Sequence, residues 1–151
     1  ELRMMVEASL DGWLTAGRFN TEFEQCLGSY LGVKHVLTVN SGSSANLVAF
    51  STLTSPRLGD RAIRHGDEVI GVAAGFPTTV NPILQFGAVP VFVDIDPVTY
   101  NINPDLIEGA ISDRTRVLLP VHLYGQAANM NAVMEIAEKH KYGLAIATIQ
   151  E

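Results

Sequence analysis

The chain has 151 residues, of which 47% are hydrophobic and 17% charged, and this suits the core of one ordinary α/β domain. A formal net charge of −6 argues against a nucleic-acid-binding surface, and no apolar stretch is long enough to cross a bilayer, so we expect neither a nucleic-acid nor a membrane partner. The single cysteine permits no internal disulfide, which favours a reducing, cytoplasmic location.

Helical and strand-like hydrophobic patterns alternate along the chain, which predicts an α/β fold with a mainly parallel sheet. Residues 21–31 are expected to form a helix, and residues 36–39 a short buried strand. A second helix is expected over residues 43–53. The segment 55–66 contains Pro, Gly and Arg and is typical of a surface loop.

The same alternation continues to the C-terminus. Strands are expected over residues 68–73, 89–95, 117–123 and 144–149, and helices after Pro77 and over residues 104–111 and 128–140. The inward face of the last helix is expected to carry Met130, Val133, Met134, Ile136 and Ala137. We interpret residues 1–20 as an N-terminal arm and residues 21–151 as one partial domain. Because the chain begins without Met and stops abruptly, we expect both ends to be cut.

The sharpest chemical feature is the run VNSGSSAN at residues 39–46, where a strand is expected to end and a helix to begin. Backbone N–H groups in a first helical turn have no partner inside the helix, and the helix dipole makes this end electropositive. Gly42 permits close approach of a ligand, and Ser43 and Ser44 can donate hydroxyl hydrogen bonds. Two interpretations stay open on this local sequence: a cradle for a phosphate group, or a plain helix cap, since Ser is a favoured N-cap residue.

Other classes of site find no support in the sequence. The chain has no G-x-G-x-x-G after a strand, no G-x-x-x-x-G-K-[ST] and no G-x-S-x-G. The four histidines lack metal-ligand spacing, and no cysteine pair accompanies them, so we assign no metal site.

Further motifs follow one another in a characteristic order. They are WLTAGRF at residues 13–19, FE at 23–24, NSGSSANL at 40–47, GDEVI at 66–70, VFVD at 91–94, YNI at 100–102 and VHLYGQ at 121–126. In these motifs the chain resembles the DegT/StrS family of sugar aminotransferases and dehydratases. The resemblance implies a three-layer α/β/α architecture, here part of the large domain of the fold type I transferases that depend on pyridoxal phosphate. It also implies pyridoxamine 5'-phosphate or pyridoxal 5'-phosphate as the cofactor.

Within that family, the segments 13–19, 41–46, 55–59 and 74–79 look most like the CDP-4-keto-6-deoxyglucose 3-dehydratases of lipopolysaccharide synthesis. Such enzymes act on a nucleotide-linked keto-deoxysugar, and the resemblance implies a homodimer for the parent protein. A nucleotide-sugar aminotransferase and a non-catalytic fragment are the alternatives. The residue that decides between the two enzymes is expected beyond the end of this sequence, with histidine typical of the dehydratases and lysine of the aminotransferases.

The resemblance assigns roles to five residues. Gly42, Ser43 and Ser44 would hold the cofactor phosphate. Phe76 would lie over the pyridine ring and orient it by stacking, unless Phe76 is simply a core residue. His122 would be a polar group near the cofactor at a strand end, where open α/β sheets bind ligands, unless it is a satisfied buried histidine.

Other polar residues have weaker claims. Thr78 and Gln126 are minor candidates for the same site, and Asp94 is expected to bind neighbouring backbone. The family's carboxylate for the pyridine nitrogen is expected near Ala147 and Thr148, which cannot supply it. None of the three lysines is placed to form a Schiff base. We therefore assign no catalytic residue and expect no turnover from this polypeptide alone.

Overall fold

A computed structural model describes the backbone of residues 1–13, 15–141, 143–144 and 147–150, and the side chains of residues 1–13 and 15–141. The chain divides into two compact units, residues 1–40 and residues 41–151. The division into an arm of residues 1–20 and a domain of residues 21–151 stays a prediction. None of the described helices has the length and apolar character needed to cross a bilayer.

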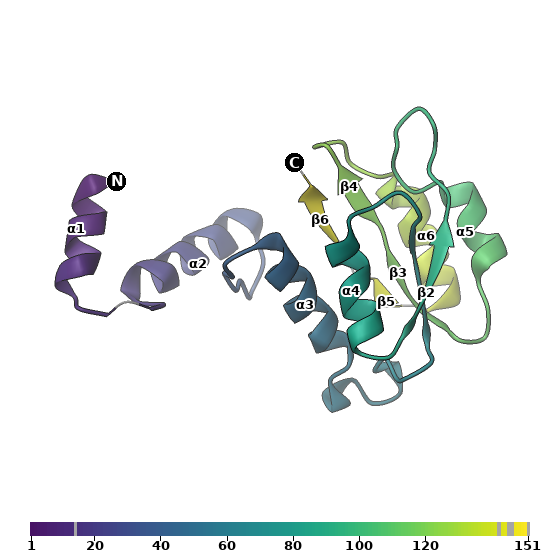
Figure 1. The fold of residues 1–151 in the computed structure, drawn as a ribbon, viewed down its shortest axis with the longest axis horizontal. Helices are drawn as coiled ribbons and strands as arrows, with labels where there is room; N and C mark the ends of the chain where they lie inside the picture. Colours follow the sequence, from purple (N-terminus) through teal and green to yellow (C-terminus); the bar gives the residue numbers. More distant parts are fainter. Residues whose placement is uncertain (14, 142, 145–146, 151) are drawn as a thin grey trace. The chain divides into compact units, whose positions relative to one another are not determined.

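The first unit contains two helices, α1 (Leu2–Leu10) and α2 (Arg18–Leu31) (Figure 1). α1 buries none of its residues and α2 buries only Gly28. α2 begins earlier than the sequence predicted, at Arg18 rather than at residue 21. It ends at Leu31 and is capped by Gly32, whose φ of 67° lies in the left-handed region that glycine adopts without steric cost.

The predicted buried strand over residues 36–39 is wrong. The segment is not assigned to a strand, and Leu37 and Val39 are 75% and 40% exposed. A strand must exchange backbone hydrogen bonds with a neighbour, and none of the described strands pairs with this segment. Its apolar pattern indicated a strand, but a pattern cannot supply the partner.

Side-chain hydrogen bonds hold this segment to α2 instead. The backbone N–H of Thr38 donates to Oε1 of Glu24 at 2.7 Å. The Thr38 hydroxyl lies 2.8 Å from the same oxygen and 2.6 Å from Oδ1 of Asn20. The pKa of Glu24 is lowered, first because the backbone N–H of Thr38 stabilises the carboxylate and next because the Thr38 hydroxyl does so.

Parallel strands form the centre of the second unit. β1 (Glu68–Val72) lies between β2 (Val89–Val93) and β3 (Thr115–Leu119), and β3 also pairs with β5 (Gly143–Leu144). β4 and β6 form a second parallel pair. Every named pair is parallel, which confirms the predicted character of the sheet.

The predicted strand over residues 117–123 is divided in two. β3 ends at Leu119 and β4 (Val121–Leu123) follows, with the buried Pro120 between them. Proline has no N–H to donate to a ladder, so the pairing is interrupted at this point. β4 then pairs with β6 (Ala147–Gln150) and not with β5.

Helices cover both faces of this sheet, which agrees with the expected three-layer architecture (Figure 1). α3 (Gly42–Leu53) packs against α4 (Pro77–Gln85), and α4 contacts β2. α5 (Pro104–Ala110) also contacts β2 and packs against α6 (Met130–His140), which contacts β5. A short 3-10 helix, η1 (Pro56–Arg61), forms within the segment predicted to be a loop.

The core surrounds β1, all of whose residues are buried. Strands, helices and the isolated bridge at Ile102 contribute side chains that are less than 2% exposed: Val69, Ile70, Ile83, Ile102, Ile107, Val117, Leu118 and Val133. Burial of one such side chain stabilises the fold by roughly 1.5–3 kcal/mol relative to its exposure. α6 buries Val133 and Ala137, which are one helical turn apart, but Met134 is 38% exposed and its predicted inward position is wrong.

A buried carboxylate opens β1, at the end of the sheet opposite the carboxyl ends of its strands. Glu68 is 6% exposed, and its Oε2 accepts a hydrogen bond from the hydroxyl of Ser112 at 2.5 Å. Its Oε1 lies 2.6 Å from Nη2 of Arg114. The pKa of Glu68 is lowered mainly by the Ser112 hydroxyl, with the charge of Arg114 acting in the same direction and burial against it. Ligands collect at the other end of parallel strands, so this network is structural.

Candidate cofactor site

The turn into α3 is capped by Ser41. Its backbone is extended, with φ −162° and ψ 160°. Its hydroxyl accepts the backbone N–H of Ser44 at 3.2 Å, and its carbonyl oxygen accepts the N–H of Ala45 at 3.0 Å. The interpretation of this run as a helix cap is therefore confirmed for Ser41.

The cap does not bind all of the backbone N–H groups in the first turn of α3. Among the residues that the structure describes, no acceptor is found for the backbone N–H of Gly42 or of Ser43. Both residues are exposed, and they lie at the positive end of the helix dipole. Two adjacent amides with the Ser43 hydroxyl beside them form a donor set that matches the oxygens of an anion.

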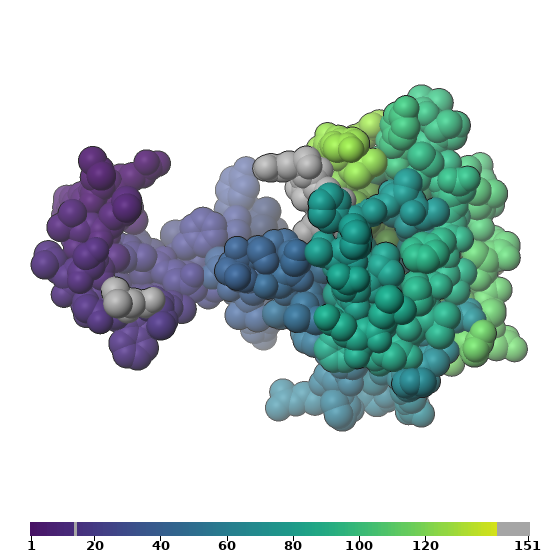
Figure 2. All heavy atoms as spheres, in the orientation of Figure 1, coloured from purple at the N-terminus to yellow at the C-terminus, as the bar shows by residue number. Residues whose placement is uncertain are grey.

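A pocket of about 170 Å³ opens beside this turn. It is lined by residues of two helices: Ser43, Ser44 and Leu47 of α3, and Thr78, Asn81, Pro82 and Gln85 of α4. The side-chain amide of Asn46 reaches the carbonyl oxygen of Thr78 at 3.5 Å and joins the helices. Figure 2 shows α3 and α4 side by side at the surface of this unit. The volume is smaller than the roughly 300–1,000 Å³ of whole small-molecule sites, so the pocket fits a phosphate group and not a complete cofactor.

Phe76 occupies the N-cap position of α4, directly before Pro77. Its side chain is 59% exposed, so the alternative that it is a core residue is wrong. An exposed ring at a helix start is available to stack on a flat ligand. The pocket that contains Ser43 and Ser44 does not include Phe76, and its contact with a cofactor ring stays a prediction.

His122 lies on β4 and is half-buried. Its Nδ1 accepts the backbone N–H of Ala128 at 3.1 Å, which places the proton of the neutral ring on Nε2. This bond closes the loop between β4 and α6. The structure does not bring His122 into the pocket of Ser43 and Ser44, and its role near a cofactor stays a prediction.

Two polar features of the second unit were given no role on the basis of the sequence. Asn81 and Gln85 follow Thr78 at helical spacing on the pocket side of α4, a signal that the sequence does contain. Asn101, in contrast, is 4% exposed and binds both the N–H of Leu123 at 3.1 Å and the carbonyl oxygen of Gln126 at 3.3 Å.

Asn101 therefore holds the turn after β4, in which Tyr124 adopts a φ of 51°. Its partners lie more than twenty positions further along the chain, so no local pattern indicates these bonds. Asp94, as predicted, binds neighbouring backbone, since its Oδ1 accepts the N–H of Ile95 at 2.8 Å.

Known proteins show the same sequence pattern and fold. Over 144 residues the chain is 58% identical to the lipopolysaccharide biosynthesis protein RfbH of Salmonella typhimurium, covering 95% of this chain and 33% of that protein. It is 47% identical over 137 residues to the dTDP-4-dehydro-2,6-dideoxy-D-glucose 3-dehydratase of Saccharopolyspora spinosa, covering 91% of this chain and 30% of that enzyme.

A solved structure has the same architecture. The crystal structure of NtdA from Bacillus subtilis with bound cofactor PMP matches with a TM-score of 0.86 and 36% identity, covering 97% of this chain and 32% of that one. The likeness confirms the expected fold type I architecture. The chain spans about a third of the length of these three proteins. A model of the DegT/DnrJ/EryC1/StrS aminotransferase family matches residues 1–147, and the chain belongs to this family.

Proposed function

We propose that this chain is part of an enzyme that binds pyridoxamine 5'-phosphate or pyridoxal 5'-phosphate and acts on a nucleotide-linked keto-deoxysugar. The reaction we propose is dehydration at C3 of CDP-4-keto-6-deoxyglucose in lipopolysaccharide O-antigen synthesis. One observation carries the cofactor assignment: the amides of Gly42 and Ser43 have no acceptor among the described residues and lie beside a pocket lined by Ser43 and Ser44. The identity to RfbH and to a sugar 3-dehydratase supports the choice of reaction.

The residues of this chain would bind and orient the cofactor. The amides of Gly42 and Ser43, with the hydroxyls of Ser43 and Ser44, would hold its phosphate. Phe76 would support the ring and His122 would supply a polar group. The bound cofactor supplies an amino group for the sugar ketone and a conjugated ring that withdraws electrons. We further propose that the whole enzyme is a homodimer.

A nucleotide-sugar aminotransferase is the second candidate, and the description of the matching family as aminotransferases favours it. The dehydratase and the aminotransferase share the cofactor and the class of substrate, so the phosphate cradle is common to both. A lysine or a histidine at the proton-transfer position would separate them. The non-catalytic alternative is compatible with the same cradle.

The cradle is tested by retention of pyridoxamine 5'-phosphate on the purified chain, measured by absorbance after dialysis. Pyridoxamine, which lacks the phosphate, is the ligand control. We expect the phosphate form to bind and pyridoxamine to bind at least tenfold more weakly, because each charge-assisted hydrogen bond contributes about 1.5–3 kcal/mol. Ser43→Ala is expected to weaken binding, whereas Ser51→Ala, at the far end of α3, leaves it unchanged. Equal binding of both compounds contradicts a phosphate cradle.

A further inference from the structure

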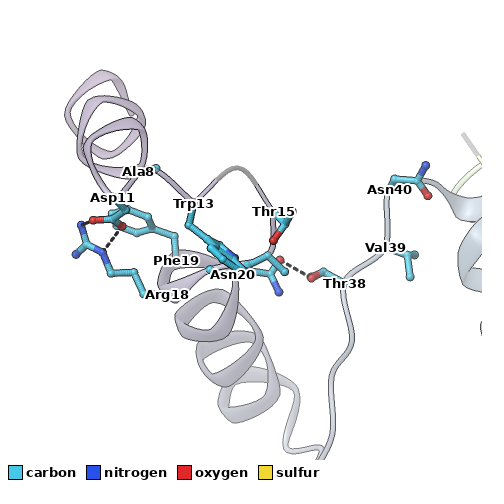
Figure 3. Close-up of a pocket in the computed structure, with 12 residues that line it drawn as sticks. Ala8, Asp11, Trp13, Thr15, Arg18, Phe19, Asn20, Thr38, Val39 and Asn40 are labelled. Carbon is cyan, nitrogen blue, oxygen red and sulfur yellow. Dashed lines mark hydrogen bonds and ion pairs between the residues drawn. The ribbon is translucent and has the colours of Figure 1, made fainter.

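The first unit contains a pocket of about 590 Å³ that the proposed function does not use. Figure 3 shows Trp13 and Thr15 in the loop between α1 and α2, with Thr38, Val39 and Asn40 on the segment that follows α2. All of the lining residues belong to residues 1–40. The volume lies within the range of roughly 300–1,000 Å³ that is usual for sites that bind small molecules.

Trp13 gives the pocket an aromatic wall of fixed orientation. Its indole Nε1 donates a hydrogen bond to the carbonyl oxygen of Ala16 at 2.9 Å, so its polar edge is satisfied within the loop. The side chain is nevertheless 65% exposed. A held indole ring with an open surface is suited to stack on another flat ring.

The described lining of the pocket has no net charge. It contains one cation and one anion, Arg18 and Asp11, and these form a bidentate pair at 2.7 and 3.3 Å. The Arg18 guanidinium also lies 4.3 Å from the centroid of the Phe19 ring. Because this cation is already paired, the pocket does not provide a phosphate site and favours an uncharged ligand.

Polar groups lie around the aromatic wall. Thr15 contributes a hydroxyl and Asn40 an amide to the lining, while the side-chain Oδ1 of Asn20 accepts the hydroxyl hydrogen bond of Thr38. Amide and hydroxyl groups bind the hydrogen-bonding edge of a heterocyclic base, whose two faces stack on aromatic side chains.

We propose that this pocket binds the nucleobase of the nucleotide-linked sugar, with the base stacked on Trp13. The inference rests on the proposed function, since the base belongs to the proposed substrate, and it assigns to the first unit a role in recognising the nucleotide. The phosphate cradle of α3 and this base pocket consist of different residues. The two assignments can therefore fail separately.

Trp13 is the one tryptophan of the sequence, so its fluorescence reports on this pocket directly. The intact chain is titrated with cytidine monophosphate, ribose 5-phosphate, inorganic phosphate and a free 6-deoxyhexose, with excitation where the base does not absorb. We expect saturable quenching with cytidine monophosphate alone. Equal responses to ribose 5-phosphate or phosphate, a response to the sugar alone, or no response to the nucleotide overturn the proposal.

Calorimetry with variants gives a readout that does not depend on the fluorophore. Trp13→Ala is expected to weaken binding of cytidine monophosphate about tenfold or more. Trp13→Phe, which keeps an aromatic face, is expected to retain most of the affinity, and Tyr30→Ala, an 85% exposed aromatic residue outside the pocket, to retain all of it. Equal affinity in Trp13→Ala and the unchanged chain overturns the proposal.

The outcomes for the two ligands separate this inference from the proposed cofactor site. If the chain retains pyridoxamine 5'-phosphate but does not bind cytidine monophosphate, the base pocket alone is wrong. If it binds the nucleotide but does not retain the cofactor, the phosphate cradle alone is wrong.

Discussion

The amide nitrogen of Ser44 lies 3.2 Å from the hydroxyl oxygen of Ser41, and this bond separates two roles within one run of small residues. Ser41 closes the start of α3, while the amides of Gly42 and Ser43 have no acceptor among the described residues. Helix stability and ligand binding are therefore expected to depend on different residues of the same turn.

Loss of the cap should lower stability without any ligand. Ser41→Ala removes the acceptor of the Ser44 N–H, and we expect a loss of about 1 kcal/mol in the free energy of unfolding. Urea denaturation followed by circular dichroism measures it. Ser43→Ala is the matched control, because the Ser43 hydroxyl is not the capping acceptor. If both variants lose the same free energy, the two roles are not separate.

Removal of a donor should lower phosphate affinity without a loss of stability. Gly42 is the first residue of α3, a position where proline fits because its missing N–H has no intrahelical acceptor. The extended backbone of Ser41 suits a residue that precedes proline. We expect Gly42→Pro to retain the unfolding midpoint and to bind pyridoxamine 5'-phosphate about tenfold more weakly, for the loss of one charge-assisted bond. Gly42→Ala, which keeps the N–H, is the control, and equal affinity of the two variants would argue against the amide as a ligand.

Most helices and strands of the second unit follow from the sequence because their apolar spacing is local. α3 and α4 begin where the serine run and Pro77 predict, and β1 and β2 begin at the predicted residues. Interruptions and partners are harder to predict. Pro120 divides one predicted strand, and residues 36–39 have the pattern of a strand but no neighbour among the described strands.

The candidate site shows the same contrast. The serine run identifies the start of α3 from a turn and a helix that adjoin in the sequence. The structural role of Asn101 could not be predicted in this way. It depends on hydrogen bonds to Leu123 and Gln126, which lie near Asn101 only in the folded chain. The helical spacing of Thr78, Asn81 and Gln85 can be read from the sequence, but only the structure shows that all three line the pocket beside α3.

The buried amide of Asn101 should be necessary for the turn after β4. Asn101→Ala leaves the N–H of Leu123 and the carbonyl oxygen of Gln126 without their partner, and we expect a loss of about 1–3 kcal/mol in the free energy of unfolding. Gln126→Ala is the control, because it retains the backbone oxygen. Hydrogen exchange of the Leu123 amide should accelerate in Asn101→Ala alone. Unchanged exchange would show that another group holds the turn.

The contact between the Thr38 hydroxyl and Glu24 should be measurable as a change in the pKa of Glu24 when the hydroxyl is removed. Thr38→Val removes the hydroxyl and keeps the backbone N–H, which is the larger cause of the lowered pKa of Glu24. We therefore expect the pKa of Glu24 to rise part of the way to its usual value, as measured by NMR titration of the carboxyl carbon. Thr21→Val, on the same helix, is the control. No rise in Thr38→Val would mean that the hydroxyl does not reach the carboxylate.

Glu68 should make the stability of the second unit depend on pH. Its pKa is lowered in the folded chain by the Ser112 hydroxyl and by Arg114, so it binds a proton more readily when the chain is unfolded. The stabilisation is therefore fully present above the unfolded value of about 4.3 and is lost as the pH falls through the folded pKa. Glu68→Gln removes this dependence.

We expect Glu68→Gln to be less stable than the unchanged chain at neutral pH, by about 1–3 kcal/mol for a buried, hydrogen-bonded charge. The difference should shrink as the pH falls below the unfolded value and through the lowered folded pKa. Urea denaturation at neutral and at acidic pH measures the difference in stability between Glu68→Gln and the unchanged chain under each condition. Glu135→Gln, at an exposed position of α6, should show no such difference. A gap between Glu68→Gln and the unchanged chain that stays constant with pH would mean that the ionised carboxylate is not the stabilising form, since only the loss of its charge can make the two chains converge in acid.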